Sequence, residues 1–259
     1  MGKGRLQRAA LQCVVMLGGL LLSACNDSGS SPGFVPNAAK VQVRFAEGAP
    51  SLEAIVNGAP TPVCGAIVQS CYFEVNGATV SNQWFYSYLT PYTSFRAGTL
   101  SLTAADSVGY TIGPIKTDSL AAGKSYTVIL VGTYPHYRAL AFEDPSSSSG
   151  AQLALYEASP ATPQAAFGSF KVSTRSNFKQ LGTTSLGHVA AVPVGNNVTD
   201  FGGYAGPISS RIGTVTPAQV DDSDTKNALP FHAANRLSLF LFDATGSGKV
   251  SQLFGSLDQ

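Results

Sequence analysis

The sequence predicts an all-β protein built of antiparallel β-sandwiches, and three observations support this. Charged residues make up 12% of the chain, about half of the usual share in soluble domains. The 27 glycines and 15 prolines suit a fold with many tight turns. Short apolar runs with strand periodicity recur along the chain, and no segment has the pattern of an amphipathic helix. Hydrophobic residues, at 44%, are numerous enough to fill a substantial core.

The expected strands of the first half lie at residues 40–45, 54–56, 72–75, 78–80, 84–88, 100–103, 125–131 and 140–142. Residues 40–45 alternate polar and apolar side chains, which is typical of a half-buried strand. Asn76-Gly77 joins two such runs and predicts a hairpin, because a type I′ turn needs positive φ at both central residues. The continuous apolar run near residues 127–131 predicts a buried strand.

A polar segment, Asp144 to Gly150, separates these strands from a second series that begins at Leu153 and Leu155. The two sides resemble each other: residues 43–58 align without gaps on residues 153–168. Glu47, Pro50 and Gly58 then align with Glu157, Pro160 and Gly168. The same offset places residues 127–131 on residues 237–241. We therefore expect two tandem immunoglobulin-like antiparallel β-sandwich domains, residues 40–145 and 152–259, joined by a linker at 146–151.

The N-terminus has the pattern of an export signal. Lys3, Arg5 and Arg8 precede an apolar run that ends in Leu22-Ser23-Ala24-Cys25. This ending resembles the lipobox of bacterial lipoproteins, which implies a signal peptide at residues 1–24 and a lipid on Cys25. The alternative is an ordinary signal peptide or an anchor helix with an incidental cysteine. Residues 25–39 are rich in Ser, Gly and Pro and are expected to form a flexible tether.

Location and partners follow from the same segment. The absence of Asp at position 26 favours the outer membrane of a Gram-negative bacterium over the inner membrane. Three of the 16 basic residues and none of the 15 acidic residues lie in the signal, so the mature chain is slightly acidic. That charge excludes an electrostatic nucleic-acid binder. The expected partners are the membrane, through the lipid on Cys25, and an envelope protein or glycan.

Two cysteines, Cys64 and Cys71, remain beyond the signal and the lipidation site. In an exported chain their spacing predicts a structural disulfide across a short loop. A redox or metal pair is the alternative, but the spacing is not C-x-x-C and no histidine lies nearby in the sequence.

Several segments resemble a bacterial family known as domain of unknown function 4397. The segments RFAEGAP and LYEASP, at residues 44–50 and 155–160, are similar to its strand-and-loop opening. Residues 92–98 are similar to its Y-x-x-L-x-A-G strand-turn, and residues 120–128 to its L-x-A-G-x-x-Y-T-V motif. Glu47 and Glu157 stand where the family often has His or Asn. The resemblance implies β-sandwich repeats in an exported or lipid-anchored protein, and no reaction.

Residues that carry chemistry are sparse. The three histidines are far apart in sequence, no metal-ligand or catalytic constellation occurs, and no cofactor is expected. Asp221, Asp222 and Asp224 lack the spacing of a calcium loop and are interpreted as a solvated turn, with weak Ca²⁺ binding left open. Glu47 and Glu157 occupy equivalent points of the two repeats, so we interpret them as structural residues rather than a catalytic pair.

Aromatic residues form the candidate binding surface: Trp84, Tyr86, Tyr88, Tyr92, Tyr134 and Tyr137. On an alternating strand Trp84, Tyr86 and Tyr88 share one face, which is either a contact platform or part of the core. The sequence as a whole predicts a non-enzymatic, lipid-anchored envelope protein that acts in surface interaction, adhesion or envelope architecture. The alternative is a polysaccharide-binding accessory protein or a hydrolytic envelope enzyme.

Overall fold

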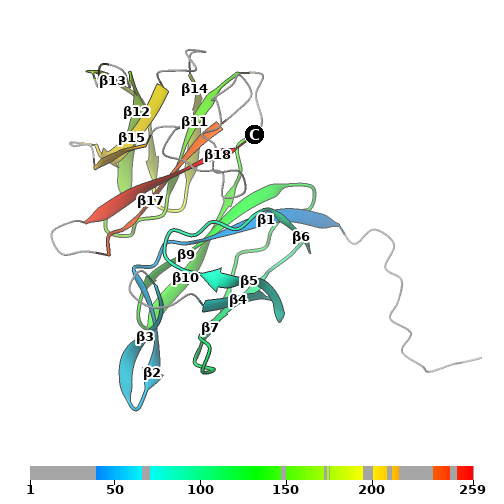
Figure 1. Cartoon of the computed structure of the whole chain (residues 1–259). Helices are drawn as coiled ribbons and strands as arrows, with labels where there is room; N and C mark the ends of the chain where they lie inside the picture. Colours follow the sequence, from blue (N-terminus) through cyan, green and yellow to red (C-terminus); the bar gives the residue numbers. More distant parts are fainter. Residues whose placement is uncertain are drawn as a thin grey trace, which may run out of the picture. The chain divides into compact units, whose positions relative to one another are not determined.

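The computed structural model describes residues 39–65, 71–146, 150–171, 174, 176–194, 201–208, 212–215, 236–245 and 250–258. These residues form strands and turns, with no helix among them, so the predicted all-β fold is confirmed (Figure 1). Accordingly, no helix in this part of the chain could cross a membrane. The predicted signal peptide, Cys25 and all but the last residue of the tether lie outside the described residues. Residues 37–259 form one compact unit.

The strands of the first half are β1 (Lys40–Glu47), β2 (Ser51–Val56), β3 (Ala59–Gly65), β4 (Cys71–Val75), β5 (Ala78–Trp84), β6 (Thr93–Arg96), β7 (Ser101–Ala105), β8 (Thr111–Lys116), β9 (Ser125–Thr133) and β10 (His136–Glu143). Those of the second half are β11 (Gln152–Glu157), β12 (Gln164–Lys171), β13 (Ser176–Ser185), β14 (Val189–Pro193), β15 (Phe201–Pro207), β16 (Gly213–Val215), β17 (Arg236–Asp243) and β18 (Ser251–Asp258).

Each half forms a sandwich from its own strands. In the first half a sheet ordered β10-β9-β1-β6 packs on a sheet ordered β5-β4-β7-β8, and β2 and β3 form a separate hairpin. In the second half the sheets are ordered β14-β11-β17-β18 and β13-β12-β15-β16. A hydrophobic core lies within each sandwich, with Phe45, Phe73 and Trp84 in the first and Leu155, Phe167 and Leu239 in the second.

The two sheets that begin the halves each contain one parallel pair. β1 pairs with β9 and β11 pairs with β17 in parallel, while the neighbouring pairings are antiparallel. Parallel neighbours need a long crossover connection. In each sandwich the chain crosses through the opposite sheet before it returns, which supplies that connection.

A third hydrophobic cluster joins the two sandwiches. It contains Ala46, Ile129 and Phe142 from the first sandwich and Tyr156, Phe240 and Phe242 from the second. β1, β9, β11 and β17 are therefore buried on both faces, one against their own core and one against the other sandwich. Strands buried on both faces have nearly continuous apolar sequences. This explains the apolar runs VILV at the end of residues 125–131 and LFLF at 239–242.

The strand pairing corrects the predicted alignment of the repeats at one point. Thr127 lies opposite Arg44 on β1, and Ser238 lies opposite Ala154, the residue equivalent to Arg44. Thr127 is thus equivalent to Ser238, and the alignment of residues 127–131 on 237–241 is wrong by one residue. A shift of one residue exchanges the two faces of a strand. Because both faces of β9 and β17 are apolar, their sequences alone carried too little alternation to fix the register.

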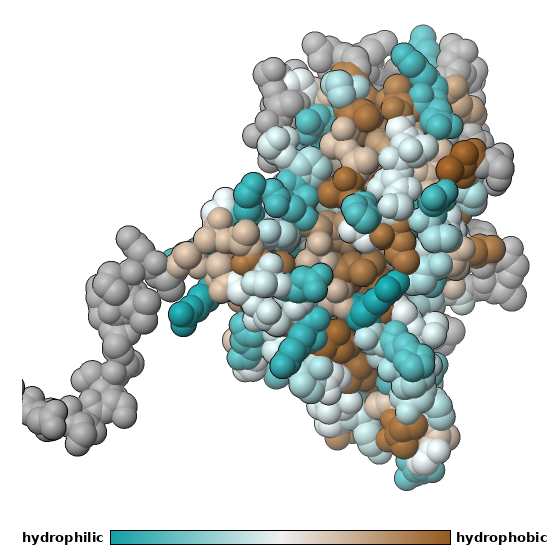
Figure 2. All heavy atoms as spheres, turned by 180° about the vertical axis from the view of Figure 1, so that it is seen from behind, coloured by the Kyte–Doolittle hydropathy of each residue, from teal (hydrophilic) through white to brown (hydrophobic). Residues whose placement is uncertain are grey.

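The predicted hairpin turn is confirmed. Asn76 and Gly77 have φ of 53° and 79°, as a type I′ turn requires, and they join β4 to β5. Asn57 and Gly58 have φ of 53° and 82° and close the β2–β3 hairpin in the same way. Figure 2 shows hydrophilic and hydrophobic residues interspersed over the described part of one face of the molecule.

Candidate functional site

A large cavity lies where the two sandwiches meet. Its volume is about 860 Å³. The first sandwich lines it with Tyr92, Gly123, Lys124, Ser125, Glu143, Asp144, Pro145 and Ser146, and the second with Gln152, Val189, Ala191, Arg236 and Asp258. The lining contains five charged side chains and one exposed aromatic ring. We call this cavity the inter-sandwich cleft.

Asp258, near the end of β18, is the acceptor for two arginines from different sandwiches. Arg44 on β1 donates from its two Nη atoms to the two carboxylate oxygens of Asp258, at 2.6 and 2.9 Å. Arg236 donates to Asp258 Oδ2 at 2.9 Å, and the Ser238 hydroxyl donates to the same oxygen at 2.6 Å. Arg44 is 3% exposed, so its charge is buried and this bidentate pair neutralises it.

The electrostatics of this group keep it ionised. Burial by itself would raise the pKa of Asp258, but the charges and hydrogen bonds of Arg44 and Arg236 outweigh burial and hold this pKa below its ordinary value. Burial also opposes the charge of Arg44, yet Asp258 raises the pKa of the guanidinium. Asp258 is therefore a permanent acceptor and has no proton to give to a substrate.

Asp144, directly after β10, is the corresponding hydrogen-bond acceptor of the first sandwich. Its Oδ1 accepts from the Thr127 hydroxyl at 2.6 Å and from the Tyr156 hydroxyl at 2.7 Å. Its Oδ2 accepts from the Tyr92 hydroxyl at 2.8 Å. Since Tyr156 belongs to β11, this carboxylate also bonds the two sandwiches to each other.

The two carboxylates are related by the repeat. Asp144 binds the hydroxyl of Thr127 on β9, and Asp258 binds the hydroxyl of the equivalent Ser238 on β17. Sequence analysis missed this pair, because it treated Asp144 only as the start of a polar segment and the register error separated Thr127 from Ser238. The sequence did contain one sign of the pair: Thr127 and Ser238 each place a hydroxyl within or beside an apolar run.

Tyr92 is the one candidate aromatic residue that the structure places in the inter-sandwich cleft. The Arg44 guanidinium lies over its ring at 4.9 Å from the centroid, and its hydroxyl is held by Asp144. Its residue exposure is 41%. One ring face and the hydroxyl thus contact the protein, while a large part of the side chain stays exposed.

The rest of the candidate aromatic surface is divided among different places. Trp84 is fully buried and stacks on Phe73 with ring centroids 4.0 Å apart, and Tyr86 is 6% exposed in the cluster between the sandwiches. The expectation of one shared face for Trp84, Tyr86 and Tyr88 is wrong, because β5 ends at Trp84 and the chain turns at residues 86–87. Trp84 and Tyr86 are core residues and cannot contact a ligand.

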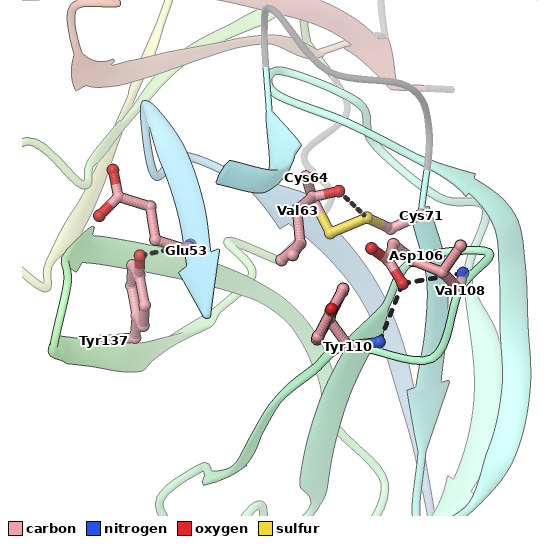
Figure 3. The surroundings of a disulfide bond; sticks show 8 residues. All are labelled: Glu53, Val63, Cys64, Cys71, Asp106, Val108, Tyr110 and Tyr137. Carbon is pink, nitrogen blue, oxygen red and sulfur yellow. Dashed lines mark hydrogen bonds between the residues drawn. A yellow bond between two sulfur atoms is a disulfide. The ribbon is translucent and has the colours of Figure 1, made fainter. Parts of the chain in front are cut away.

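Tyr134 and Tyr137 line a second, smaller cavity of about 390 Å³ at the β9–β10 turn. Its other walls come from β2 and β8, with Ile55, Ile112 and Ile115 among the lining residues. The Tyr137 hydroxyl accepts from the Glu53 backbone N–H at 2.8 Å and donates to the Ser51 carbonyl at 3.1 Å. Tyr137 therefore attaches the β2–β3 hairpin to β10 (Figure 3).

Glu47 and Glu157 are fully buried at the equivalent ends of β1 and β11. Neither carboxylate oxygen of Glu47 has a hydrogen-bond partner, while Glu157 Oε1 accepts from the Ser159 backbone N–H at 3.0 Å. Burial raises the pKa of each carboxyl to about 8. Neither residue lines the two cavities described above, so these two carboxyls, which hold protons near neutral pH, have no access to a substrate there.

The disulfide between Cys64 and Cys71 is present, as predicted (Figure 3). It joins the end of β3 to the first residue of β4, with the two Cα atoms 5.6 Å apart. Both cysteines are fully buried in the first core, and Cys71 Sγ lies 3.0 Å from the Val63 carbonyl oxygen. This environment is that of a structural crosslink.

In the described part of the chain no three His, Cys, Asp or Glu side chains lie close enough to hold a metal ion. His136 and His188 belong to different sandwiches, at the start of β10 and beside β14. Asp221, Asp222 and Asp224 lie outside the described residues, so weak Ca²⁺ binding there stays untested.

Two comparisons bear on the identity of this two-sandwich protein. The family model named domain of unknown function (DUF4397) matches residues 66–168, which is less than half of the chain. The match runs from β4 through β11 into β12, and it includes the motifs at residues 92–98, 120–128 and 155–160. This segment of the chain is thus similar to the DUF4397 family; the opening segment at residues 44–50 lies outside the match. No curated protein matches the chain.

Proposed function

We propose that the protein is a lipid-anchored, non-enzymatic component of the bacterial cell envelope that acts through surface interaction, in adhesion or envelope architecture. The anchor is the lipid on Cys25, and the location is the outer membrane. The proposal extends to a protein that needs no cofactor or metal, does not bind nucleic acid, and meets an envelope protein or glycan.

The main support for the proposal is that the polar groups between the sandwiches are already bonded to protein partners. Asp144 and Asp258 each accept hydrogen bonds from both sandwiches, and the Arg44 guanidinium is paired with Asp258. Groups that are already saturated by protein partners bind the two sandwiches together rather than a reacting substrate. The inter-sandwich cleft, with the exposed Tyr92 in its lining, is left open, which supports a binding role.

The hydrolytic alternative is less well supported. Glycoside hydrolysis needs a carboxylic acid that can protonate the leaving group, beside a second carboxylate. In the inter-sandwich cleft Asp258 stays ionised, whereas the carboxyls that hold protons near neutral pH, Glu47 and Glu157, are sealed in the protein. A catalytic acid must be accessible to the substrate and must have a raised pKa. Here Asp258 lines the cleft, whereas the raised pKa values belong to the buried Glu47 and Glu157.

The anchor is tested with the full chain expressed in a Gram-negative host. Wild-type protein should label with a radioactive fatty acid and sediment with the outer membrane, and Cys25→Ser should lose both properties. Continued labelling of the Cys25→Ser variant would refute the assignment of the lipid to this residue.

The interaction is tested with the detergent-solubilised full chain and immobilised outer-membrane fragments. We expect saturable binding and no release of new reducing ends from the envelope polysaccharide. Reducing ends that appear with the wild-type protein, and continue to accumulate, would show an enzyme instead. A failure to bind the fragments would remove the basis for surface interaction.

A further inference from the structure

Tyr92 has three properties that together suit a ligand-binding residue. It is exposed to 41%, it lines the inter-sandwich cleft, and its position is fixed at two points by Arg44 and Asp144. Burial raises the pKa of the Tyr92 hydroxyl and outweighs the opposing charge of Arg44, so this hydroxyl stays protonated and donates to Asp144. A ring held in this way loses little conformational entropy when a ligand packs on its exposed part.

The charged groups around Tyr92 already have protein partners. Lys124 Nζ, which is exposed, donates to Glu143 Oε1 at 2.7 Å, and Arg236 pairs with Asp258 at 2.9 Å. Asp144 has no ion pair among the described residues, but its carboxylate accepts from three hydroxyls, those of Tyr92, Thr127 and Tyr156. A charged ligand would have to compete with one of these pairs for its partner. An uncharged ligand need not do so, which favours a neutral molecule.

The cleft nevertheless offers hydrogen bonds. Lys124 has three N–H donors and Glu143 two acceptor oxygens, and the pair between them uses only part of this capacity. Ser125 and Gln152, from opposite sandwiches, add a hydroxyl and an amide to the lining. A ligand that fits must therefore carry many hydroxyl groups together with an apolar face for the ring. A pyranose sugar has both, since its axial C–H groups form an apolar face and its hydroxyls point outward.

We propose that the inter-sandwich cleft binds a neutral oligosaccharide, with one sugar ring stacked on the exposed part of Tyr92 and the neighbouring hydroxyls bonded to the Lys124–Glu143 pair and the Gln152 side. This inference rests on the proposed function and names the class of envelope ligand. The volume of about 860 Å³ lies within the range of about 300–1,000 Å³ for ligand clefts, so there is room for more than one sugar. Both sandwiches are needed, because each supplies one wall.

The test uses the detergent-solubilised full chain on an array of neutral oligosaccharides of glucose, galactose, mannose and N-acetylglucosamine, with oligogalacturonate as the charged comparison. Dissociation constants for the bound members come from titration calorimetry. Tyr92→Ala should weaken binding at least tenfold, while Tyr92→Phe, which keeps the ring, should stay within threefold of wild type. Tyr110→Ala is the matched control, because Tyr110 is exposed to 39% and does not line the cleft. It should bind as the wild type does.

A second variant covers the case in which Tyr92→Ala does not fold. Lys124→Ala changes an exposed side chain of the cleft lining, and we expect it to weaken binding three- to tenfold. Equal affinities of wild type and Lys124→Ala in that case would overturn the site. So would the absence of any neutral binder on the array, a preference for oligogalacturonate, or equal weakening by Tyr92→Ala and Tyr110→Ala. If outer-membrane fragments bind while the array stays empty, this inference fails and the proposed function stands.

Discussion

The buried glutamates predict an unusual dependence of stability on pH. The pKa of Glu47 and of Glu157 is about 8 in the folded protein, against an ordinary value of 4.5 that applies to the unfolded chain. The folded state therefore holds two protons that the unfolded state releases between these values. By linkage, the stabilising contribution of both groups is complete below pH 4.5 and is lost as the pH rises through about 8.

The magnitude follows from the size of the shift. One pKa unit corresponds to about 1.4 kcal/mol, so each glutamate lowers the free energy of unfolding by about 1.4 kcal/mol per pH unit within this window. Between pH 5.5 and 7.5 the two groups together lower it by about 5 kcal/mol. That loss is comparable with the total stability of many domains, about 5–15 kcal/mol.

The assay is urea denaturation at pH 5.5, 6.5 and 7.5, followed by circular dichroism for the whole chain. Fluorescence of Trp84, the single tryptophan, reports on the first sandwich, where it stacks on Phe73. Glu47→Gln removes one titrating group and should halve the slope of stability against pH, and the double variant with Glu157→Gln should abolish the contribution of both. The slope is the readout, because any packing change caused by Gln is the same at each pH.

The control is Glu143→Gln, which removes an exposed carboxylate of the same type and should leave the slope as it is in the wild type. The reasoning would be refuted by a wild-type protein that becomes more stable from pH 5.5 to 7.5. A slope that is equal in wild type and Glu47→Gln would refute it for Glu47 in particular.

Three further outcomes are expected, each measured as a change in the free energy of unfolding. Asp258→Asn should cost about 3–5 kcal/mol, because the Arg44 guanidinium, buried in the protein, loses its counter-charge; a cost below 1 kcal/mol would contradict the role of the pair. Replacing both Cys64 and Cys71 with Ala should lower stability by about 2.5 kcal/mol from loop entropy, seen first in Trp84 fluorescence, and thiol alkylation of the unreduced wild type should find both cysteines blocked. Tyr156→Phe should cost about 1–3 kcal/mol, since it removes one donor to Asp144 and leaves the ring stack with Phe240; an unchanged stability would show that the hydroxyl is dispensable.

Comparison of prediction and structure shows where local information was sufficient. The strands at residues 40–45 and 72–80 were predicted correctly, because side-chain alternation and the Asn76-Gly77 turn depend on the local backbone alone. The disulfide was also predictable, since Cys64 and Cys71 are separated by a short loop. Among the described strands, no sheet combines strands from both sides of the polar segment.

The candidate site was predicted only in part. Tyr92 was among the candidate residues, but Trp84 and Tyr86 were grouped with it on the assumption that the strand continued to residue 88. The chain turns after Trp84, and this sends Tyr86 into the cluster between the sandwiches, where its hydroxyl donates to the Asp243 carbonyl. Nothing in the local pattern marks that contact, which spans 157 positions of the sequence.

The sequence by itself determined the β class of this protein and its crosslink, because each depends on periodicity or on neighbours a few residues apart. Only the tertiary structure showed which partners the charged residues have. Arg44 and Asp258 are 214 positions apart, and Asp144 meets Tyr156 only when the two sandwiches pack together. The register of β17, the burial of Glu47 and Glu157, and the place of Tyr92 in the cleft follow from that packing. Contacts between distant strands carry no periodic signal in the sequence, so their partners become known only in the folded chain.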